Sequence, residues 1–538
     1  MANDQWIASS YDELGNRSQI TSSLGAKIDV MRNELGNILQ MTASRSEQGQ
    51  WTASMQYNEL GQEIERILPG DVISKWQYDI TGRPTHHRVS SQSRNTRRRV
   101  YNWDVNHQLR SMVNELTGVK VTYGYDEFSN LVWANQDSKF DFLYRSVDDV
   151  GNLYETKDKS DRIYGAGSRL LETKDAQFSY DEEGNLVEKV EKNGDTWKYE
   201  YYGSGMMSKV IKPDHTEVTF KYDSLGRRIE KRSEDKATHF VWDGNTILHE
   251  YSTENVADTL DNLNSSQTDT AIADDLVTWV FNDGFVPSAK ITSEGHYSII
   301  SDYLGTPVEA YDEKGNRVWT AELDVYGRVK EVTGEKDFIP FRYQGQYDDV
   351  EIGLYYNRFR YYDPEQGNYT QIDPIGLVGG NPSLYGYVKD PNTWFDVFGM
   401  APWKNGGFDK WFNNATPEEV SANIGAVKKQ LRNGGGKHEL FPVSDAAKAR
   451  ELGFKAEELK KMAIDKDKFI FVDVPDKDGN LHTGPHSTGK KRIGNQSSKA
   501  SSNFHIHLSN ALQGANTKRE ARLIIGQYHR KYMKVSCK

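Results

Sequence analysis

A short phrase that recurs through most of the chain is the strongest constraint on its fold. It joins Tyr-Asp, or a close relative, to a Gly-Asn or Gly-Arg pair, as in YDELGN from Tyr11, YDITGR from Tyr78, YDEEGN from Tyr180 and YDEKGN from Tyr311. Asp caps a turn and Gly supplies a positive φ. Stretches between the phrases, such as TEVTFKYD, alternate with period two. The pattern predicts β-hairpins of about 20 residues, stacked into a long sheet.

Composition agrees with β structure and excludes several classes. Aromatic residues make up 12% of the chain, with 30 Tyr, which favours pleated sheets and argues against disorder. The single cysteine, Cys537, allows neither an internal disulfide nor a cysteine zinc cage. The sequence shows no signal peptide and no membrane-spanning segment. We therefore expect a soluble chain that is made in the cytoplasm and needs another machine for export. The repeats begin without a recognisable export domain, which is also compatible with a truncated form.

Charge divides the chain into two parts. Residues 401–538 hold 25 Lys and Arg against 14 Asp and Glu, whereas the first 400 residues hold 42 against 64. The basic part therefore carries +11 and the acidic part −22. A basic surplus favours a polyanionic partner, of which nucleic acid is the commonest. The alternative is that the acidic part simply accommodates the basic one.

The repeats resemble those of the YD-repeat, or Rhs, family, whose sheets spiral into a hollow shell. The stretch FRYQGQYDDVEIGLYYNRFRYYDPEQGNYTQIDPIGL, within residues 341–400, resembles the Rhs-associated core that plugs the shell. The resemblance implies a mainly β fold, with a spiralling β-hairpin shell over 1–340, the core over 341–400 and a small α+β toxin domain over 401–538. A less regular stretch over 253–275 is predicted to be a surface loop.

In that family the core ends in a self-cleaving motif, in which two Asp residues act as an aspartyl-protease-like pair. Here the first phrase reads DPIGL from Asp373, and the second reads DVFGM from Asp396. Two carboxylates suit peptide hydrolysis when one stays protonated and the other activates water. The resemblance implies that Asp373 and Asp396 catalyse cleavage between Met400 and Ala401. The alternative is that both phrases only form tight turns.

The repeat phrases stop at residue 401, and helical patterns replace them. TPEEVSANIGAVKKQLRN, with Thr416 as its N-cap, and SDAAKARELGFKAEELKKMAI predict helices. FIFVDVP at 469–475 predicts a strand, and TKREARLIIGQYHRKYMK predicts a basic C-terminal helix. This segment is therefore expected to form an α+β domain.

Histidines gather in this domain. His438 lies in KHELFP, His482 and His486 lie in LHTGPHS, and His505 and His507 lie in NFHIHL. An HxxxH pair can present two imidazoles to one divalent metal. Since no usable cysteine exists, a site of nitrogen and oxygen ligands for Mg, Mn, Ni or Zn is expected.

The histidine phrases resemble those of HNH (ββα-metal) superfamily nucleases. That resemblance implies metal ligation by His438, His482 and His486, with Glu439 in the general-base position and with His438 and His486 in the catalytic centre. It implies metal-assisted phosphodiester hydrolysis of DNA or RNA. Phosphate contacts are expected from the basic residues Lys490, Lys491, Arg492 and Lys499.

Three other functions stay open for this chain. A metal-independent RNase would use His438, His486 or His505 as acid and base. An ADP-ribosyltransferase toxin is a second alternative, and a non-enzymatic surface scaffold is the third. The histidines outside the cluster, His86, His87 and His529, are expected to be exposed to solvent.

The family resemblance implies competition between bacteria. The chain would leave its cell as an effector, through a type VI-like or other secretion apparatus, and would act in the cytoplasm of a target cell. A cognate immunity protein, encoded as a separate chain, would block it.

Overall fold

The computed structural model describes residues 5–13, 16–33, 36–45, 49–137, 141–254, 275–282, 284–376, 383–400, 403–404, 407–422, 424–431, 437–466, 468–486 and 498–535. The chain divides into two compact units. The first comprises residues 1–377 and 381–402, and the second comprises 378–380 and 403–538. Most of the loop predicted over 253–275 lies outside the described residues.

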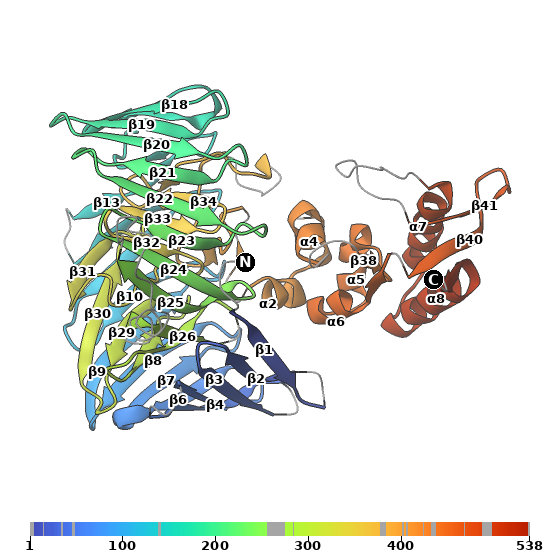
Figure 1. Cartoon of the computed structure of the whole chain (residues 1–538), viewed down its shortest axis with the longest axis horizontal. Helices are drawn as coiled ribbons and strands as arrows, with labels where there is room; N and C mark the ends of the chain where they lie inside the picture. The colour runs from blue at the N-terminus through green and yellow to red at the C-terminus, as the bar shows by residue number, and fades with distance from the viewer. Residues whose placement is uncertain are drawn as a thin grey trace, which may run out of the picture. The chain divides into compact units, whose positions relative to one another are not determined.

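Two long antiparallel meanders build the first unit (Figure 1). The first sheet holds β1 (Ile7–Tyr11), β2 (Arg17–Ser22), β3 (Ala26–Arg32), β4 (Ile38–Arg45), β5 (Trp51–Tyr57), β6 (Glu63–Leu68), β7 (Val72–Tyr78), β8 (Pro84–Ser91), β9 (Arg94–Trp103), β10 (Leu109–Asn114), β11 (Lys120–Tyr125), β12 (Leu131–Gln136) and β13 (Phe142–Tyr144). The short 3-10 helix η1 (Pro69–Asp71) connects β6 to β7. A two-stranded sheet of β14 (Ser146–Val147) and β15 (Leu153–Tyr154) follows.

The second meander pairs each strand with its neighbour in sequence. It holds β16 (Arg162–Tyr164), β17 (Leu170–Thr173), β18 (Ala176–Tyr180), β19 (Leu186–Glu191), β20 (Thr196–Tyr201), β21 (Met207–Ile211), β22 (Glu217–Tyr222), β23 (Arg228–Arg232), β24 (Lys236–Asp243), β25 (Thr246–Glu254), β26 (Val277–Phe281), β27 (Pro287–Ile291), β28 (His296–Ser301), β29 (Pro307–Tyr311), β30 (Arg317–Leu323) and β31 (Val329–Thr333), with the 3-10 helix η2 (Ala166–Ser168) between β16 and β17.

The recurring phrase forms the turn between paired strands, as the sequence predicts. At the turn after β7, Asp79 Oδ1 accepts hydrogen bonds from the backbone N–H groups of Thr81 and Arg83, at 2.9 and 3.0 Å. Gly82 adopts φ +85° there, a conformation that a residue with a Cβ rarely takes. The preceding Tyr78 donates its hydroxyl to the carbonyl of Glu63, at 2.8 Å. Each phrase thus closes one hairpin while its tyrosine ties that hairpin to the previous one.

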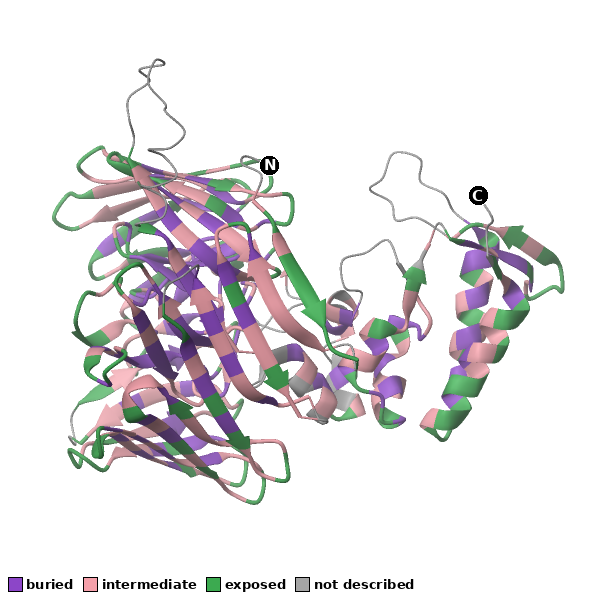
Figure 2. Cartoon of the chain, turned by 60° about the horizontal axis from the view of Figure 1, so that its bottom comes forward, coloured by how far each residue is buried: buried purple, intermediate pink, exposed green. Residues whose placement is uncertain are grey.

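Residues that alternate along the strands are buried and exposed in turn, which gives the two large sheets a buried face (Figure 2). Trp51 and Val89 are fully buried in the cluster that holds the first sheet against β25–β29. The same alternation corrects one prediction: His87, expected at the surface, is fully buried. Its ring stacks on Trp76 with centroids 3.7 Å apart and shares a hydrogen bond with Ser74 Oγ. His87 lies two residues before Val89 and therefore on the same inward face.

The core segment packs on the second meander. It contains a four-stranded sheet of β32 (Tyr347–Asp349), β33 (Leu354–Asn357), β34 (Arg360–Asp363) and β35 (Asn368–Tyr369), and ends with β36 (Trp394–Phe395). Tyr356 and Tyr361 share one hydrophobic cluster with Phe220 and Phe240. The tyrosine-rich core therefore fills the buried side of this sheet.

The second unit is a small assembly of helices and short strands. Its elements are β37 (Trp403–Lys404), α2 (Gly407–Asn414), α3 (Pro417–Ala422), α4 (Ile424–Leu431), β38 (Lys437–Glu439), η4 (Val443–Asp445), α5 (Ala446–Glu451), α6 (Ala456–Lys461), β39 (Ala463–Asp465), β40 (Phe469–Pro475), β41 (Leu481–Gly484), α7 (Lys499–Gln513), α8 (Lys518–Tyr532) and β42 (Met533–Val535). β40 lies between β41 and β42, and both α7 and α8 contact β40. Among the described residues, no helix is long and apolar enough to cross a membrane.

Candidate self-cleavage and metal centres

One buried arginine brings the two predicted aspartates together. Arg360 begins β34, and its side chain is 1% exposed. Its Nη2 donates to Asp373 Oδ2 at 3.1 Å and to Asp396 Oδ2 at 3.4 Å. Its Nε donates to the carbonyl of Gly399 at 2.6 Å. The two carboxylates and the backbone just before Met400 therefore meet at a single guanidinium.

The DVFGM phrase wraps around its own carboxylate. Asp396 Oδ1 accepts hydrogen bonds from the N–H groups of Met400 and Phe398, at 3.0 and 3.3 Å. Gly399 has φ +61°, and a Cβ there would come within 2.6 Å of the Asn357 carbonyl oxygen. Glycine is thus required at this turn, and Asp396 is held rigidly beside it. Ala401 lies outside the described residues, so the geometry ends at Met400.

Buried tyrosines complete the surroundings of Asp396. Tyr369 donates its hydroxyl to Asp396 Oδ2 at 3.1 Å, and the Arg360 guanidinium carbon lies 3.6 Å from the Tyr369 ring centroid. Burial first, and the Asp396 charge second, raise the pKa of Tyr369 well above its usual range. Tyr369 therefore remains a hydrogen-bond donor. Asp373 Oδ1 accepts from Ile375 N at 2.8 Å, so the first phrase is also a turn.

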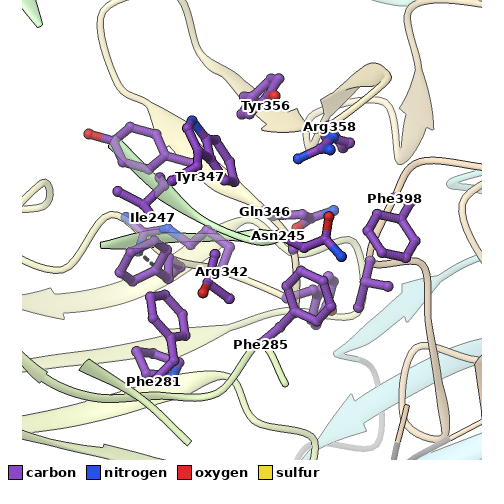
Figure 3. A pocket seen from close by; sticks show the side chains of 17 residues that line it. Asn245, Ile247, Phe281, Phe285, Arg342, Gln346, Tyr347, Tyr356, Arg358 and Phe398 are labelled. Carbon is purple, nitrogen blue, oxygen red and sulfur yellow. Dashed lines mark hydrogen bonds between the residues drawn. The ribbon is translucent and has the colours of Figure 1, made fainter. Parts of the chain in front are cut away.

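A ring-lined pocket fixes the residues before Gly399 (Figure 3). The ring of Phe398 meets that of Phe285 edge-on, with centroids 5.5 Å apart. Val397 is buried, and a Cβ on Gly345 would lie 2.3 Å from its carbonyl oxygen. Close packing therefore holds residue 397 in place, although valine lacks the ring constraint of proline.

In the second unit, three histidines converge. His438 comes from β38, His486 follows β41, and His505 lies on α7. One ring nitrogen from each lies within 4.8 Å of the others. The ring centroids are 5.2 to 5.3 Å apart. This set can hold one metal ion.

A fourth histidine adjoins this set and corrects another prediction. The sequence predicts a solvated His529, but on α8 its ring is half-buried, with Nε2 3.0 Å from His438 Nε2. Its position follows from α8 packing, since it lies one helical turn after the buried Ile525. Burial lowers the pKa of His529.

Apolar rings surround His438, which is fully buried. Phe469 and Phe471 of β40 and Phe504 of α7 lie with ring centroids 5.2 to 5.8 Å from its own. Burial, followed by the neighbouring His505, lowers the pKa of His438 to about 2. A neutral imidazole is the form that binds metal.

Hydrogen bonds orient the rings on the two helices. His505 Nδ1 lies 2.7 Å from the Ser501 carbonyl, and His529 Nδ1 lies 2.7 Å from the Ile525 carbonyl. A carbonyl oxygen can only accept, so each Nδ1 carries a hydrogen. The lone pair of each neutral ring is therefore on Nε2.

His482 does not join the cluster. Its Nε2 lies 2.9 Å from Asp476 Oδ2 at the other end of the β40–β41 hairpin. The third histidine of the cluster is instead His505, which the sequence could place there only by assuming a helix. His507 instead bonds the Pro475 carbonyl through Nε2, at 2.8 Å. Alternation along β38 places Glu439 on the face opposite His438, which does not favour the predicted general-base role.

Of the predicted phosphate contacts, the structure describes one. Lys499 is exposed at the start of α7, whereas Lys490, Lys491 and Arg492 lie outside the described residues. On α8, Lys518 and Arg522 both pair with Glu458, at 2.6 and 2.9 Å. The carboxylate of Glu458 therefore already neutralises part of the charge of these two cations.

The sequence profile of the teneurin YD-shell family matches residues 26–376. The chain belongs to this family. The predicted YD-repeat resemblance and mainly β fold are confirmed. The match ends before the second unit, whose activity must be argued from its own site.

Several curated proteins match a large part of the chain. Double-stranded DNA deaminase toxin A of Burkholderia cenocepacia (strain H111) is 29% identical over 72% of this chain and 28% of its own length. Probable deoxyribonuclease RhsA of Dickeya dadantii (strain 3937) is 30% identical over 53% of this chain and 19% of its own. The tRNA nuclease WapA of Bacillus subtilis (strain 168) is 26% identical over 53% and 11%. The chain thus spans less than a third of the length of these relatives.

A solved structure supports the fold. The crystal structure of TcdB2-TccC3-Cdc42 matches 73% of this chain and 21% of its own, with a TM-score of 0.52 and 17% identity. At this identity the likeness concerns the fold alone.

Proposed function

We propose that the second unit is a metal-dependent nuclease toxin that the shell carries. The convergence of His438, His486 and His505 is the observation that supports this proposal. The +11 charge of residues 401–538 suits a polyanionic substrate. The names of the relatives, which include nucleases, agree with it.

The donor set favours one class of metal. Three imidazoles suit zinc, nickel, copper or iron, whereas magnesium and manganese prefer oxygen ligands. Among the four metals expected from the sequence, zinc and nickel therefore fit this site. A bound ion would supply Lewis-acid stabilisation of the charge that develops on a phosphodiester. His438 would anchor it from a wall of phenylalanine rings, and exposed Lys499 would help to hold the substrate backbone.

The order of elements agrees with the HNH resemblance. The β40–β41 hairpin precedes α7, with one histidine after the hairpin and one on the helix. This is the ββα order that gives the superfamily its name. The position of Glu439 on the other face of β38 leaves the general base to be found by mutation.

Two alternatives are less favoured by the geometry. An RNase that uses two imidazoles as acid and base needs them on either side of a phosphate. Ring nitrogens within 4.8 Å of one another instead surround a single point. A zinc deaminase uses a His/Cys/Cys or three-cysteine site, and this chain has only one cysteine.

Incubation of the purified chain with plasmid DNA and total RNA tests the nuclease proposal. We expect cleavage that EDTA abolishes and that added zinc or nickel restores. His438→Ala and His505→Ala should each abolish cleavage. His482→Ala is the control, because this histidine lies outside the cluster, and the variant should retain cleavage. Cleavage that survives EDTA would contradict the proposal and favour the metal-independent RNase.

We also propose that the shell releases this unit by cleavage after Met400. The shared contact of Asp373 and Asp396 with Arg360 supports that step. Mass spectrometry of the purified chain is the test, and only intact protein of 61.4 kDa would contradict it. Export through a secretion apparatus, action in the target cytoplasm and inhibition by an immunity protein belong to the same proposal. Growth arrest on expression, relieved by His486→Ala, would test its toxic part.

A further inference from the structure

The contact between His438 and His529 has a direction that the hydrogen bonds determine. His529 Nδ1 donates to the Ile525 carbonyl, so a neutral His529 can only accept at Nε2. The atom 3.0 Å from that Nε2 is His438 Nε2, which must then carry the hydrogen. His438 consequently has its lone pair on Nδ1.

That Nδ1 atom is the unexplained group at this site. It is buried within a fully buried ring and has no hydrogen-bond partner among the described residues. Native structures usually satisfy a buried acceptor, because leaving it without a partner forfeits the hydrogen bond that it makes to water in the unfolded chain. One ring nitrogen of His438 lies within 4.8 Å of a ring nitrogen of His486 and of His505. Because His438 Nε2 already donates to His529, a metal ion shared with His486 and His505 would bind His438 at Nδ1 and satisfy it.

We propose that His438 binds the metal through Nδ1, and that His529 is a positioning residue that fixes the His438 tautomer. The group of mutually close nitrogens includes His438, His486 and His505 but not His529. The centre would therefore have three protein ligands and an open position, as catalytic zinc sites do. His529 acts on the metal only through His438, by a relay that ends at the Ile525 carbonyl. This inference deepens the proposed nuclease function and rests on its metal centre.

Zinc and nickel binding to the full-length chain, measured by calorimetry, tests the relay. His529→Leu removes the acceptor, so affinity should fall by about 10–100-fold. His529→Gln offers a carbonyl oxygen at a similar distance from the main chain and should remain within about threefold of wild type. His507→Gln on α7 is the matched control and should leave the affinity unchanged. If His529 were a ligand, the Gln variant would also lose affinity and the spectrum of the cobalt-substituted chain would change its coordination class.

A second measurement needs neither metal nor activity. Long-range proton–nitrogen spectra of the histidine-labelled, metal-free chain report which ring nitrogen carries hydrogen. We expect His438 to be protonated at Nε2 in wild type and in His529→Gln, and to be mixed in His529→Leu. A hydrogen on His438 Nδ1 in wild type would overturn the inference. Wild-type chain that binds no metal would overturn both the metal centre and the inference, whereas metal binding without nuclease activity would overturn only the proposed function.

Discussion

Replacing Arg360 by leucine removes the group that joins the two halves of the proposed cleavage centre. The guanidinium donates to Asp373, to Asp396, and to the carbonyls of Gly399 and Leu384. The side chains of the two aspartates are only 6% and 1% exposed. Water therefore cannot replace the lost cation.

The structure sets the size of the effect. Removing one partner of a buried ion pair costs about 3–5 kcal/mol, because a charge stays buried without compensation. Both carboxylates lie against the same guanidinium nitrogen, at 3.1 and 3.4 Å, so without the cation they would also repel each other, by on the order of 3 kcal/mol at an effective dielectric constant of about 20. One carboxyl can take up a proton and relieve most of this, so the two costs do not add. We expect Arg360→Leu to destabilise the first unit by about 3 kcal/mol and to prevent release of the second unit.

Two measurements separate chemistry from stability. Mass spectrometry follows cleavage after Met400, and thermal unfolding follows the shell. Arg358→Leu is the matched control: Arg358 Nη2 donates to the Leu225 carbonyl at 3.1 Å and has no carboxylate partner among the described contacts. It should cost about 1 kcal/mol and leave cleavage intact. Asp396→Asn keeps an acceptor for the Met400 N–H and should abolish cleavage with little loss of stability. Cleavage at the wild-type rate in Arg360→Leu would refute the reasoning.

Three further results are expected. His249 is fully buried between Ser22 and Thr278, and burial lowers its pKa from 6.5 to about 3. Below pH 6.5 the unfolded chain binds a proton that the folded shell excludes, so the free energy of unfolding should fall by up to about 5 kcal/mol as the pH drops to 3. His249→Asn should flatten the pH dependence of the unfolding temperature, and an unchanged slope would contradict this prediction. His486→Ala should weaken zinc binding in calorimetry by more than about 100-fold, and similar affinities for this variant and His482→Ala would contradict the ligand set. Glu439→Gln should keep nuclease turnover within about threefold, whereas a loss of 10²–10⁴-fold would restore its general-base role.

Local chemistry explains why the shell could be predicted. The turn at Asp79 depends on groups no more than four residues apart, so its sequence phrase contains every group that forms the turn. Consecutive hairpins then pair with their neighbours, which fixes the order of strands. The prediction that His87 is exposed to solvent was wrong, because His87 lies on the inward face of β8. Its even spacing from Val89 was the available signal, because residues two apart share one face of a strand.

The proposed cleavage centre was predictable only in part. The resemblance named Asp373 and Asp396, but no motif named Arg360, which lies earlier on β34. Its role depends on the folding of three separate segments around one guanidinium. A single sequence contains no spacing that reports such a contact. A buried arginine in a tyrosine-rich stretch is a hint, since a charge there requires a partner.

The histidine cluster shows where spacing can mislead. The HxxxH spacing of His482 and His486 puts both rings on one face only if the segment is helical. Here His482 lies in β41, while His486 follows its end, so the two diverge. His505 lies next to Phe504 on the buried side of α7, and His529 follows Ile525 by one turn on α8. Helical periodicity could therefore have indicated that both rings face inward. It could not have shown that the two helices and β38 meet, and that meeting places His505 in the group of candidate ligands and His529 against His438.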